Sequence, residues 1–174
     1  LTAVDRKFSV ERAVVFSMQA ISGAGYPGVA SMDIIDNVIP FISGEEEKLE
    51  YEPAKIMGKF DGKALHQHPF KVSAHTNRVA VVDAHTICLS VELKDKATAD
   101  DLIHAFESFE YSPMLQGLPS LPEKAIVYHH EPNRPQPRLD RNLYHGMASH
   151  VGRVRPCAIL DYRMVTLSHN TIKD

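Results

Sequence analysis

The segment RAVVFSMQAISGAGYPG, residues 12–28, joins a strand-like run to a loop of small residues. Residues 12–18 are short, apolar and followed by glycines, which is typical of a buried strand. Gln19 places an amide where that strand ends. An ordinary strand-to-helix turn would use the same residue types, but a glycine-rich loop also lets a flat ligand approach the backbone. The segment therefore predicts a buried strand that ends beside a candidate site.

The rest of the chain alternates strands with a few helices. Several strands and two or three helices predict an α+β domain, built as a mixed, largely antiparallel β-sheet with helices packed on one face. The other face of such a sheet must then meet something, often another subunit. Strands are expected at 70–82, 85–94, 125–130, 149–156 and within 157–170, short helical turns within 28–41, helices at 43–60 and 98–109, and an extended arm or loop at 131–141.

The two longer helices carry recognisable start signals. Ser43 with Glu46 three residues later resembles a capping box, and Thr98 with Asp101 forms a second one. Pro53 lies inside the first of these helices. It removes a backbone donor, so we expect it to kink or split the helix.

Composition excludes several classes of partner. The chain has 174 residues and 44% hydrophobic residues, enough for one domain with a real core. The net charge is −3 with scattered Lys and Arg, so we predict neither nucleic acid nor membrane as a partner. No signal peptide is visible, and a cytoplasmic location is the simplest prediction. The sequence starts without Met, as though cut from a larger protein.

Four charged side chains are candidates for ligand binding. Glu45 and Lys48, three residues apart, share a helical face and could serve an ammonium and a phosphate, although a solvated charged face is the alternative. Arg78 could hold a carboxylate, and His85 could move protons near neutral pH. A surface salt bridge and a hydrogen-bonded core histidine are the alternatives. Spacing alone does not bring this pair together, since a tight turn at 83–84 would place Arg78 opposite position 89.

Neither a metal site nor a reactive thiol is predicted. The HQH and HH runs at 66–68 and 129–130 lack an obvious carboxylate or thiolate set. Cys88 and Cys157 have no nearby activating base in the sequence, so we expect both to be structural thiols. Gln19 could instead offer its amide to a developing oxyanion.

Five blocks in order resemble one family over nearly the whole chain: MQAISGAGYPG, DNVIPFISGEEEK, NRVAVVDAHT, EPNRPQPRLDR and SHNTIKD. They are similar to the C-terminal domain of aspartate-semialdehyde dehydrogenase, of the archaeal and fungal branch. The resemblance implies a single domain, 1–174, with the fold of the C-terminal domain of glyceraldehyde-3-phosphate dehydrogenase. It also implies that the N-terminal NADP-binding domain and the nucleophilic cysteine lie outside this chain.

The resemblance implies roles in catalysis and substrate binding. His85 would be the acid/base group, and Gln19 would orient a thioester intermediate. Arg78 would clamp the substrate carboxylate, with Glu45 near its amino group and Lys48 near its phosphate.

Cofactor contacts are implied by the same resemblance. Ser22, Gly23 and Ala24 match the loop that closes on the nicotinamide, and Asn170 matches a late cofactor contact. The segment 83–85 reads Asp-Ala-His where relatives often carry Asp-Gly-His.

The implied activity is an oxidoreductase step of amino-acid biosynthesis, which reduces β-aspartyl phosphate with NADPH to aspartate semialdehyde and phosphate on the route to threonine, methionine, isoleucine and lysine. A homodimer or homotetramer is implied, and this chain alone should be inactive. Two alternatives stay open. One is an N-acetyl-glutamyl-phosphate reductase, whose substrate lacks the ammonium that Glu45 would meet. The other is a non-catalytic dimerisation or interaction module.

Overall fold

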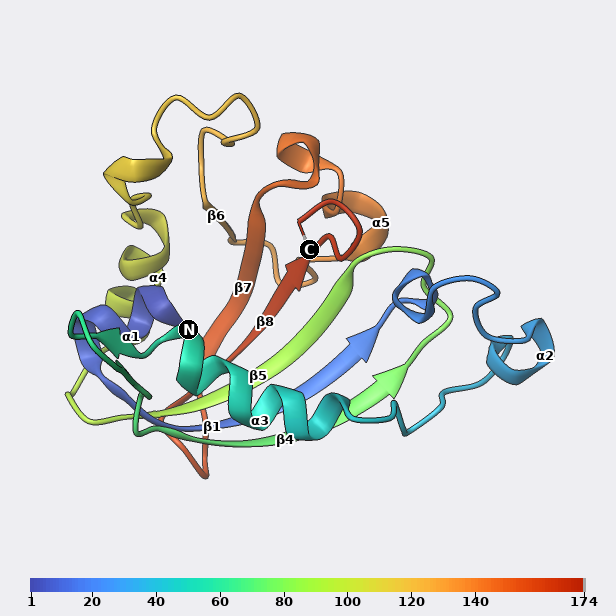
Figure 1. Cartoon of the computed structure of the whole chain (residues 1–174), viewed down its shortest axis with the longest axis horizontal. Coiled ribbons are helices and arrows are strands. Elements are labelled where there is room, and N and C mark those ends of the chain that lie inside the picture. Colours follow the sequence, from blue (N-terminus) through green and yellow to red (C-terminus); the bar gives the residue numbers. More distant parts are fainter. Residues whose placement is uncertain (174) are drawn as a thin grey trace.

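A computed structural model describes residues 1–173, and its centre is one mixed six-stranded sheet (Figure 1). The strand order is β4-β1-β5-β8-β7-β6. This confirms the predicted fold class. The six strands are β1 (Val10–Gln19), β4 (Lys71–Arg78), β5 (His85–Leu93), β6 (Ile126–His129), β7 (Ser149–Pro156) and β8 (Tyr162–Ser168). A separate small hairpin joins β2 (Lys59–Phe60) to β3 (Leu65–His66).

The strand pairing places β1 between two strands that follow each other in the sequence. β1 runs parallel to β4 and antiparallel to β5. The β6–β7 pair is parallel, and the β5–β8 and β7–β8 pairs are antiparallel. The expectation that a tight turn at 83–84 would place Arg78 opposite position 89 is therefore wrong, because β1 lies between β4 and β5. Arg78 pairs with Gln19, and Leu89 pairs with Val15.

Helices cover one face and one edge of the sheet. α1 (Thr2–Phe8) packs against α4 (Ala99–Glu107), which also contacts β6 and β7. α3 (Glu45–Ile56) lies along β4 (Figure 1). The remaining short pieces are α2 (Ser31–Ile34) and α5 (Pro137–Asp140), with 3₁₀ turns at Ile21–Ala24, Pro113–Leu115 and Leu143–Gly146.

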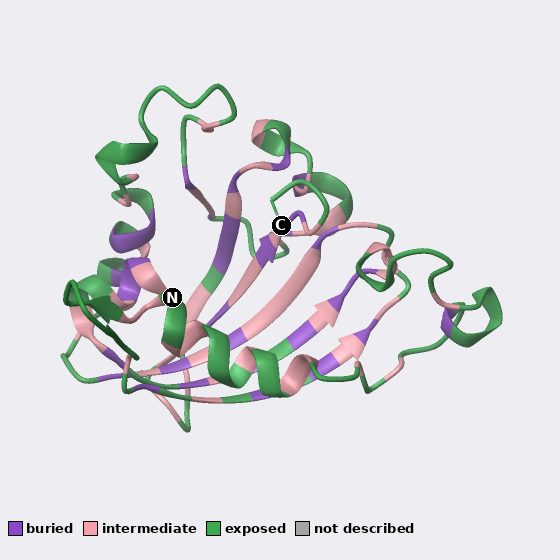
Figure 2. Cartoon of the chain, in the orientation of Figure 1, coloured by how far each residue is buried: buried purple, intermediate pink, exposed green. Residues whose placement is uncertain are grey.

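The hydrophobic core lies between the sheet and α1 and α4. Alternate residues of β1 and β5 point into it, so Ala13 pairs with Val91 and Val15 with Leu89, all four being buried. Leu102 and Phe106 of α4 are buried in the same core on its helix side. Figure 2 shows the buried positions running along the central strands and the inner sides of these helices.

α3 departs from its prediction in two ways: Ser43 does not cap it, and Pro53 does not split it. Gly44, in a left-handed conformation with φ of 75°, is the N-cap residue, and no side chain caps the helix. Glu46 instead accepts a hydrogen bond from the backbone N–H of Thr76, and Glu50 accepts one from Ala74. These carboxylates satisfy donors on the edge strand β4, which would otherwise be open to pairing. The helix continues through Pro53 to Ile56.

Other sequence predictions had mixed outcomes. The capping box of α4 is confirmed, because Thr98 and Asp101 exchange hydrogen bonds in both directions. The proline-rich segment 131–141 is not extended throughout. Its second half forms α5, which starts at Pro137.

A buried polar cluster holds α5 against β6 and β7. Asp140 is fully buried, forms a two-pronged ion pair with Arg134 and accepts from the backbone N–H of Gln136 at 2.6 Å. Beside it, His129 Nε2 and His150 Nδ1 lie 3.1 Å apart. Within the described residues, His150 Nε2 has no hydrogen-bond partner. Burial lowers the pKa of His150 to about 4 and also lowers that of His129.

Acid should destabilise this domain through His150. Its pKa falls from 6.5 to about 4 on folding, so between these pH values the unfolded chain binds a proton that the folded chain excludes. Stability is therefore lost as pH falls through this window, by about 1.4 kcal/mol per pH unit, or roughly 3–4 kcal/mol over the whole window. Urea unfolding at pH 7 and pH 4.5 measures the loss. The His150→Gln variant should lose clearly less than the parent, and an equal loss would contradict this assignment.

Candidate active site

Three strand ends bring the predicted residues together at one end of the sheet. Gln19 ends β1, Arg78 ends β4 and His85 begins β5. Because β1 is parallel to β4 and antiparallel to β5, the last residues of β1 and β4 meet the first residues of β5. The sheet topology therefore groups side chains that are far apart in sequence.

Ala20 anchors both Arg78 and His85 through its backbone. The Arg78 guanidinium donates from Nη1 to the Ala20 carbonyl at 2.7 Å, and the Ala20 N–H donates to His85 Nδ1 at 3.2 Å. Ala20 is fully buried and Arg78 nearly so. Since Nδ1 accepts a hydrogen bond, the neutral ring carries its proton on Nε2.

Gly23 lies over both functional side chains. It belongs to the 3₁₀ turn Ile21–Ala24, which folds back so that the Gly23 N–H donates to the Ala20 carbonyl. A Cβ atom at Gly23 would lie 3.0 Å from Arg78 Nη1 and 3.2 Å from His85 Nε2. The two side chains therefore converge beneath one point of the loop, where a side chain would intrude.

A chain of polar contacts links the strand end to α3. Gln19 Nε2 donates to Glu45 Oε2 at 3.0 Å, and Lys48 Nζ lies 3.7 Å from Glu45 Oε1. Burial lowers the pKa of Arg78, and the nearby negative charge of Glu45 opposes that shift. The Lys48 side chain is 53% exposed, so its ammonium faces solvent at the rim.

Asn170 ties the loop to the turn before His85. Its Oδ1 accepts from the Ala84 N–H and its Nδ2 donates to Ser22 Oγ, both at 2.9 Å. Arg141 donates to the Asp83 carbonyl at 3.4 Å, a contact that the sequence did not indicate. The only available signal was the proline-rich block in which Arg141 lies.

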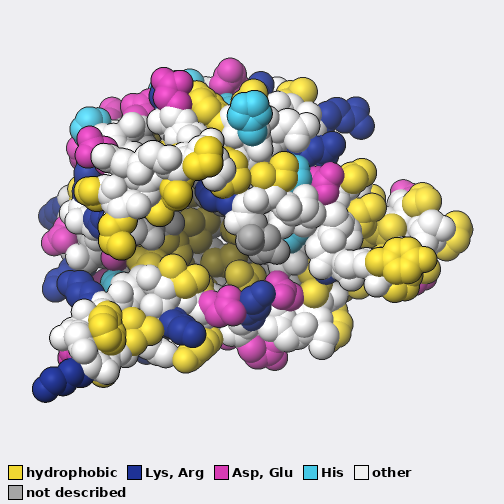
Figure 3. All heavy atoms as spheres, turned by 45° about the horizontal axis from the view of Figure 1, so that its top comes forward, with side chains coloured by type: hydrophobic (Ala, Val, Ile, Leu, Met, Phe, Trp, Pro, Cys, Tyr) yellow, Lys and Arg dark blue, Asp and Glu magenta, His cyan; other side chains and the backbone are white. Residues whose placement is uncertain are grey.

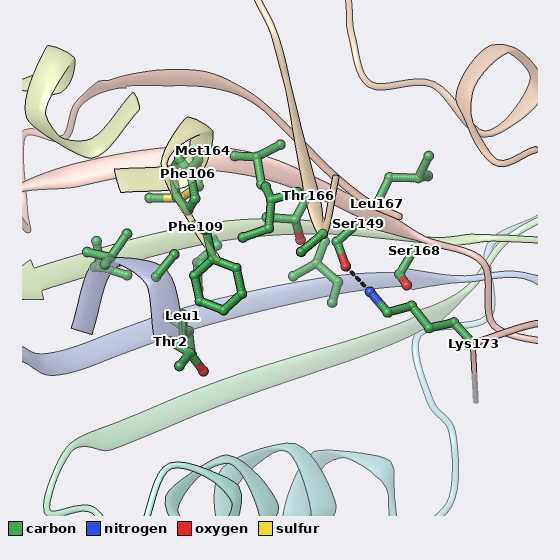
Figure 4. Close-up of a pocket in the computed structure, with 18 of the residues that line it drawn as sticks. Leu1, Thr2, Phe106, Phe109, Ser149, Met164, Thr166, Leu167, Ser168 and Lys173 are labelled. Carbon is green, nitrogen blue, oxygen red and sulfur yellow. Dashed lines mark hydrogen bonds between the residues drawn. The ribbon is translucent and has the colours of Figure 1, made fainter. Parts of the chain in front are cut away.

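An apolar cavity of about 380 Å³ adjoins His85 on the helix-covered face (Figure 4). Residues of α1, β5 and β8 line most of it, whereas Arg78 and Lys48 do not line it. Its polar end includes His85, Ser149 and Lys173. Lys173 Nζ donates to Ser149 Oγ at 2.6 Å.

The described residues give no support to a metal site or a membrane span. Across residues 1–173, no group of three or more His, Cys, Asp or Glu side chains is arranged to hold a metal ion. No helix in the same part of the chain is long and apolar enough to cross a membrane. The prediction that Cys88 and Cys157 are structural thiols stays a prediction, although Cys157 has polar neighbours that the sequence did not reveal. Backbone N–H groups of Leu160 and Ile159 lower the pKa of this thiol.

The chain belongs to the semialdehyde dehydrogenase dimerisation-domain family, whose model matches residues 1–173. Among individual proteins, it is similar to the aspartate-semialdehyde dehydrogenases of Archaeoglobus fulgidus, with 48% identity over 91% of this chain, and Cryptococcus neoformans, with 45% identity over 98%. These matches confirm the resemblance to the archaeal and fungal branch.

The structural comparison agrees with the sequence comparison. The fold matches a crystal structure of aspartate semialdehyde dehydrogenase with NADP from Candida albicans, with a TM-score of 0.86 and 39% identity over 98% of this chain. The chain covers 45% and 49% of the two curated relatives, and 49% of the Candida chain. It thus spans about half the length of the relatives it matches.

Replacing Gly23 by alanine should disturb the site without unfolding the domain. The new methyl group would press on Arg78 and His85, while Gly23 itself is exposed and at the edge of the fold. We expect the His85 ring resonances in NMR spectra to shift and the unfolding free energy to change by less than about 1 kcal/mol. Ala24→Ser, at the neighbouring exposed position, is the matched control. Unmoved His85 resonances in Gly23→Ala would show that the loop does not lie on this ring.

Proposed function

We propose that this chain is the substrate-binding and dimerising half of an NADP-dependent aspartate-semialdehyde dehydrogenase, acting in the cytoplasm. The full protein would reduce β-aspartyl phosphate to aspartate semialdehyde and phosphate. The observation that carries the proposal is the joint anchoring of Arg78 and His85 on Ala20, with Glu45 bonded to Gln19 beside them. The family match and the similarity to named aspartate-semialdehyde dehydrogenases support it.

The charges of the site complement those of the proposed substrate. β-Aspartyl phosphate carries a carboxylate, an ammonium and a phosphate. Arg78 would clamp the carboxylate from the buried side, where its guanidinium is already fixed by Ala20. Glu45 would meet the ammonium, and Lys48 would reach the phosphate from the exposed rim. Three opposite charges, of which those of Arg78 and Glu45 are held by hydrogen bonds, would orient the carbonyl carbon for attack.

His85 and Gln19 would act on the reacting carbonyl. A thiol outside this chain would form the thioester, and NADPH, when bound, would supply the hydride. His85 holds its ring proton at Nε2, the atom beneath Gly23, so it can donate a hydrogen bond to the carbonyl oxygen and exchange a proton there. Gln19 can turn its amide from Glu45 toward the same oxygen.

The loop Ile21–Ala24 fits the edge of a flat cofactor ring. Gly23 and Ala24 are small and exposed, so a ring can approach their backbone closely. Ser22 and Asn170 bond to each other and hold this loop beside the turn at Ala84. Asn170 would therefore support the nicotinamide loop through Ser22, in addition to any direct contact.

The chain should need a second domain for turnover. The proposed domain spans residues 1–174, and the rest of the enzyme would bind NADP and carry the thiol. The purified chain should therefore fold but show no phosphate-dependent reduction of NADP with aspartate semialdehyde. Ligand-induced NMR shifts confined to the site, with no turnover, are the expected result. Measurable NADP reduction by this chain alone would contradict the division of labour.

We further infer that the assembly is a homodimer formed through the sheet face that no helix covers. The family model describes a dimerisation domain. On that face Phe16 of β1 is 47% exposed and stacks on His75 of β4. Obligate interfaces bury exposed aromatic side chains of this kind. A homotetramer would add a second interface to the same dimer.

Two other functions use the same fold. An N-acetyl-glutamyl-phosphate reductase would bind a substrate without an ammonium, and Glu45 would then have no cation to meet other than Lys48. A non-catalytic interaction module would not require the shared anchoring of Arg78 and His85. The geometry of the site therefore favours the aspartyl enzyme.

In the full-length enzyme, His85→Gln should lower kcat with β-aspartyl phosphate by about 10²- to 10⁴-fold, because the positioned proton donor is lost. His66→Gln, on the exposed hairpin β2–β3, is the matched control and should leave kcat unchanged. NADPH oxidation measures both. Turnover of N-acetylglutamyl phosphate but not of aspartyl phosphate would contradict the proposed substrate. A fully active His85→Gln enzyme would contradict the proposed catalytic role of His85.

A further inference from the structure

The segment 26–41, named here the arm, carries large apolar side chains in solvent. It leaves the sheet beyond β4 and includes α2 (Figure 1), and apolar side chains cover its outer end (Figure 3). Ile34 is its only fully buried residue. Five large apolar side chains of the arm are more than half exposed: Tyr26, Met32, Ile35, Val38 and Phe41. A cluster of this size on one projecting segment marks an interaction surface.

The arm is connected at both ends to the proposed substrate site. It follows the loop Ile21–Ala24 and leads into α3, which carries Glu45 and Lys48. Near its end, Ile39 pairs with Arg78, and the two residues exchange backbone hydrogen bonds of 3.0 and 2.8 Å. Whatever holds the arm therefore also holds the backbone of Arg78.

Charge indicates what covers the arm. Its charged residues are Asp33 and Asp36, without any Lys, Arg or His between residues 26 and 41. On the uncovered sheet face, Arg155 of β7 and Arg163 of β8 are direct cross-strand partners. Neither forms an ion pair with any residue in the described part of the chain. Like charges placed opposite each other destabilise a sheet unless a counter-charge lies between them.

We propose that the arm docks on the uncovered sheet face of a second copy of this chain, with Asp33 and Asp36 facing Arg155 and Arg163. Two-fold symmetry makes the contact reciprocal, so each copy receives the other's arm. Docking buries the apolar cluster and fixes the connection between Ile39 and Arg78. The substrate site of each copy then reaches its final geometry only in the dimer. This inference rests on the proposed homodimer.

The first experiment removes the apolar contact. Met32→Glu with Ile35→Glu, made in the full-length protein, should raise the dimer dissociation constant on the order of 100-fold or more in analytical ultracentrifugation. Met114→Glu is the matched control, because this methionine is 91% exposed outside the arm and should have no effect. Circular dichroism of each variant shows that the fold is retained. A double variant that dimerises like the parent would overturn the proposal.

The second experiment tests which surface receives the arm. Asp33→Lys with Asp36→Lys should weaken the dimer, as should Arg155→Glu with Arg163→Glu. A chain that carries all four changes should dimerise more tightly than either double variant, because every reversed charge meets a reversed partner. Absence of this rescue would overturn the pairing of the arm with the sheet face. A monomeric parent protein at micromolar concentration would instead contradict the proposed homodimer itself. The state of the parent protein therefore distinguishes a wrong docking surface from a wrong oligomeric state.

Discussion

The site depends on the backbone of one buried residue, Ala20. Its carbonyl accepts from Arg78 and its N–H donates to His85, so a single point of the main chain fixes both side chains. This is possible only because β1 lies between β4 and β5, whose facing ends supply the two residues. Backbone groups at the end of a central strand move little, so they provide a more rigid anchor than another side chain would.

The acidic start of α3 shows how one element can serve both fold and site. Glu46 and Glu50 bond to N–H groups of the edge strand β4 and so hold the helix along that edge. Glu45, on the same first turn, bonds to Gln19 at the end of β1. The structural carboxylates thus set the position of the functional one. Burial of Arg78 within reach of Glu45 adds an electrostatic reason for this arrangement.

The two faces of the sheet have different roles. One face packs on α1 and α4 and contains the apolar core, with the cavity beside His85 at its end. The opposite face carries Phe16 and the neighbouring cations Arg155 and Arg163, a surface that a single copy leaves unbalanced. Stability comes mainly from the first face, whereas the second supplies the surface for assembly.

Local sequence patterns determined the elements of this protein. The alternation in β5, the apolar run of β1 and the capping box of α4 were readable because they depend on neighbours a few residues away. The family resemblance also indicated the site residues, and the structure brings Gln19, Arg78 and His85 to one end of the sheet. Tertiary structure alone decided that β1 separates β4 from β5, that Glu46 bonds to a strand instead of capping its helix, and that Arg141 supports the turn before His85. Each of these depends on contacts between residues distant in sequence, and no local pattern records such pairings.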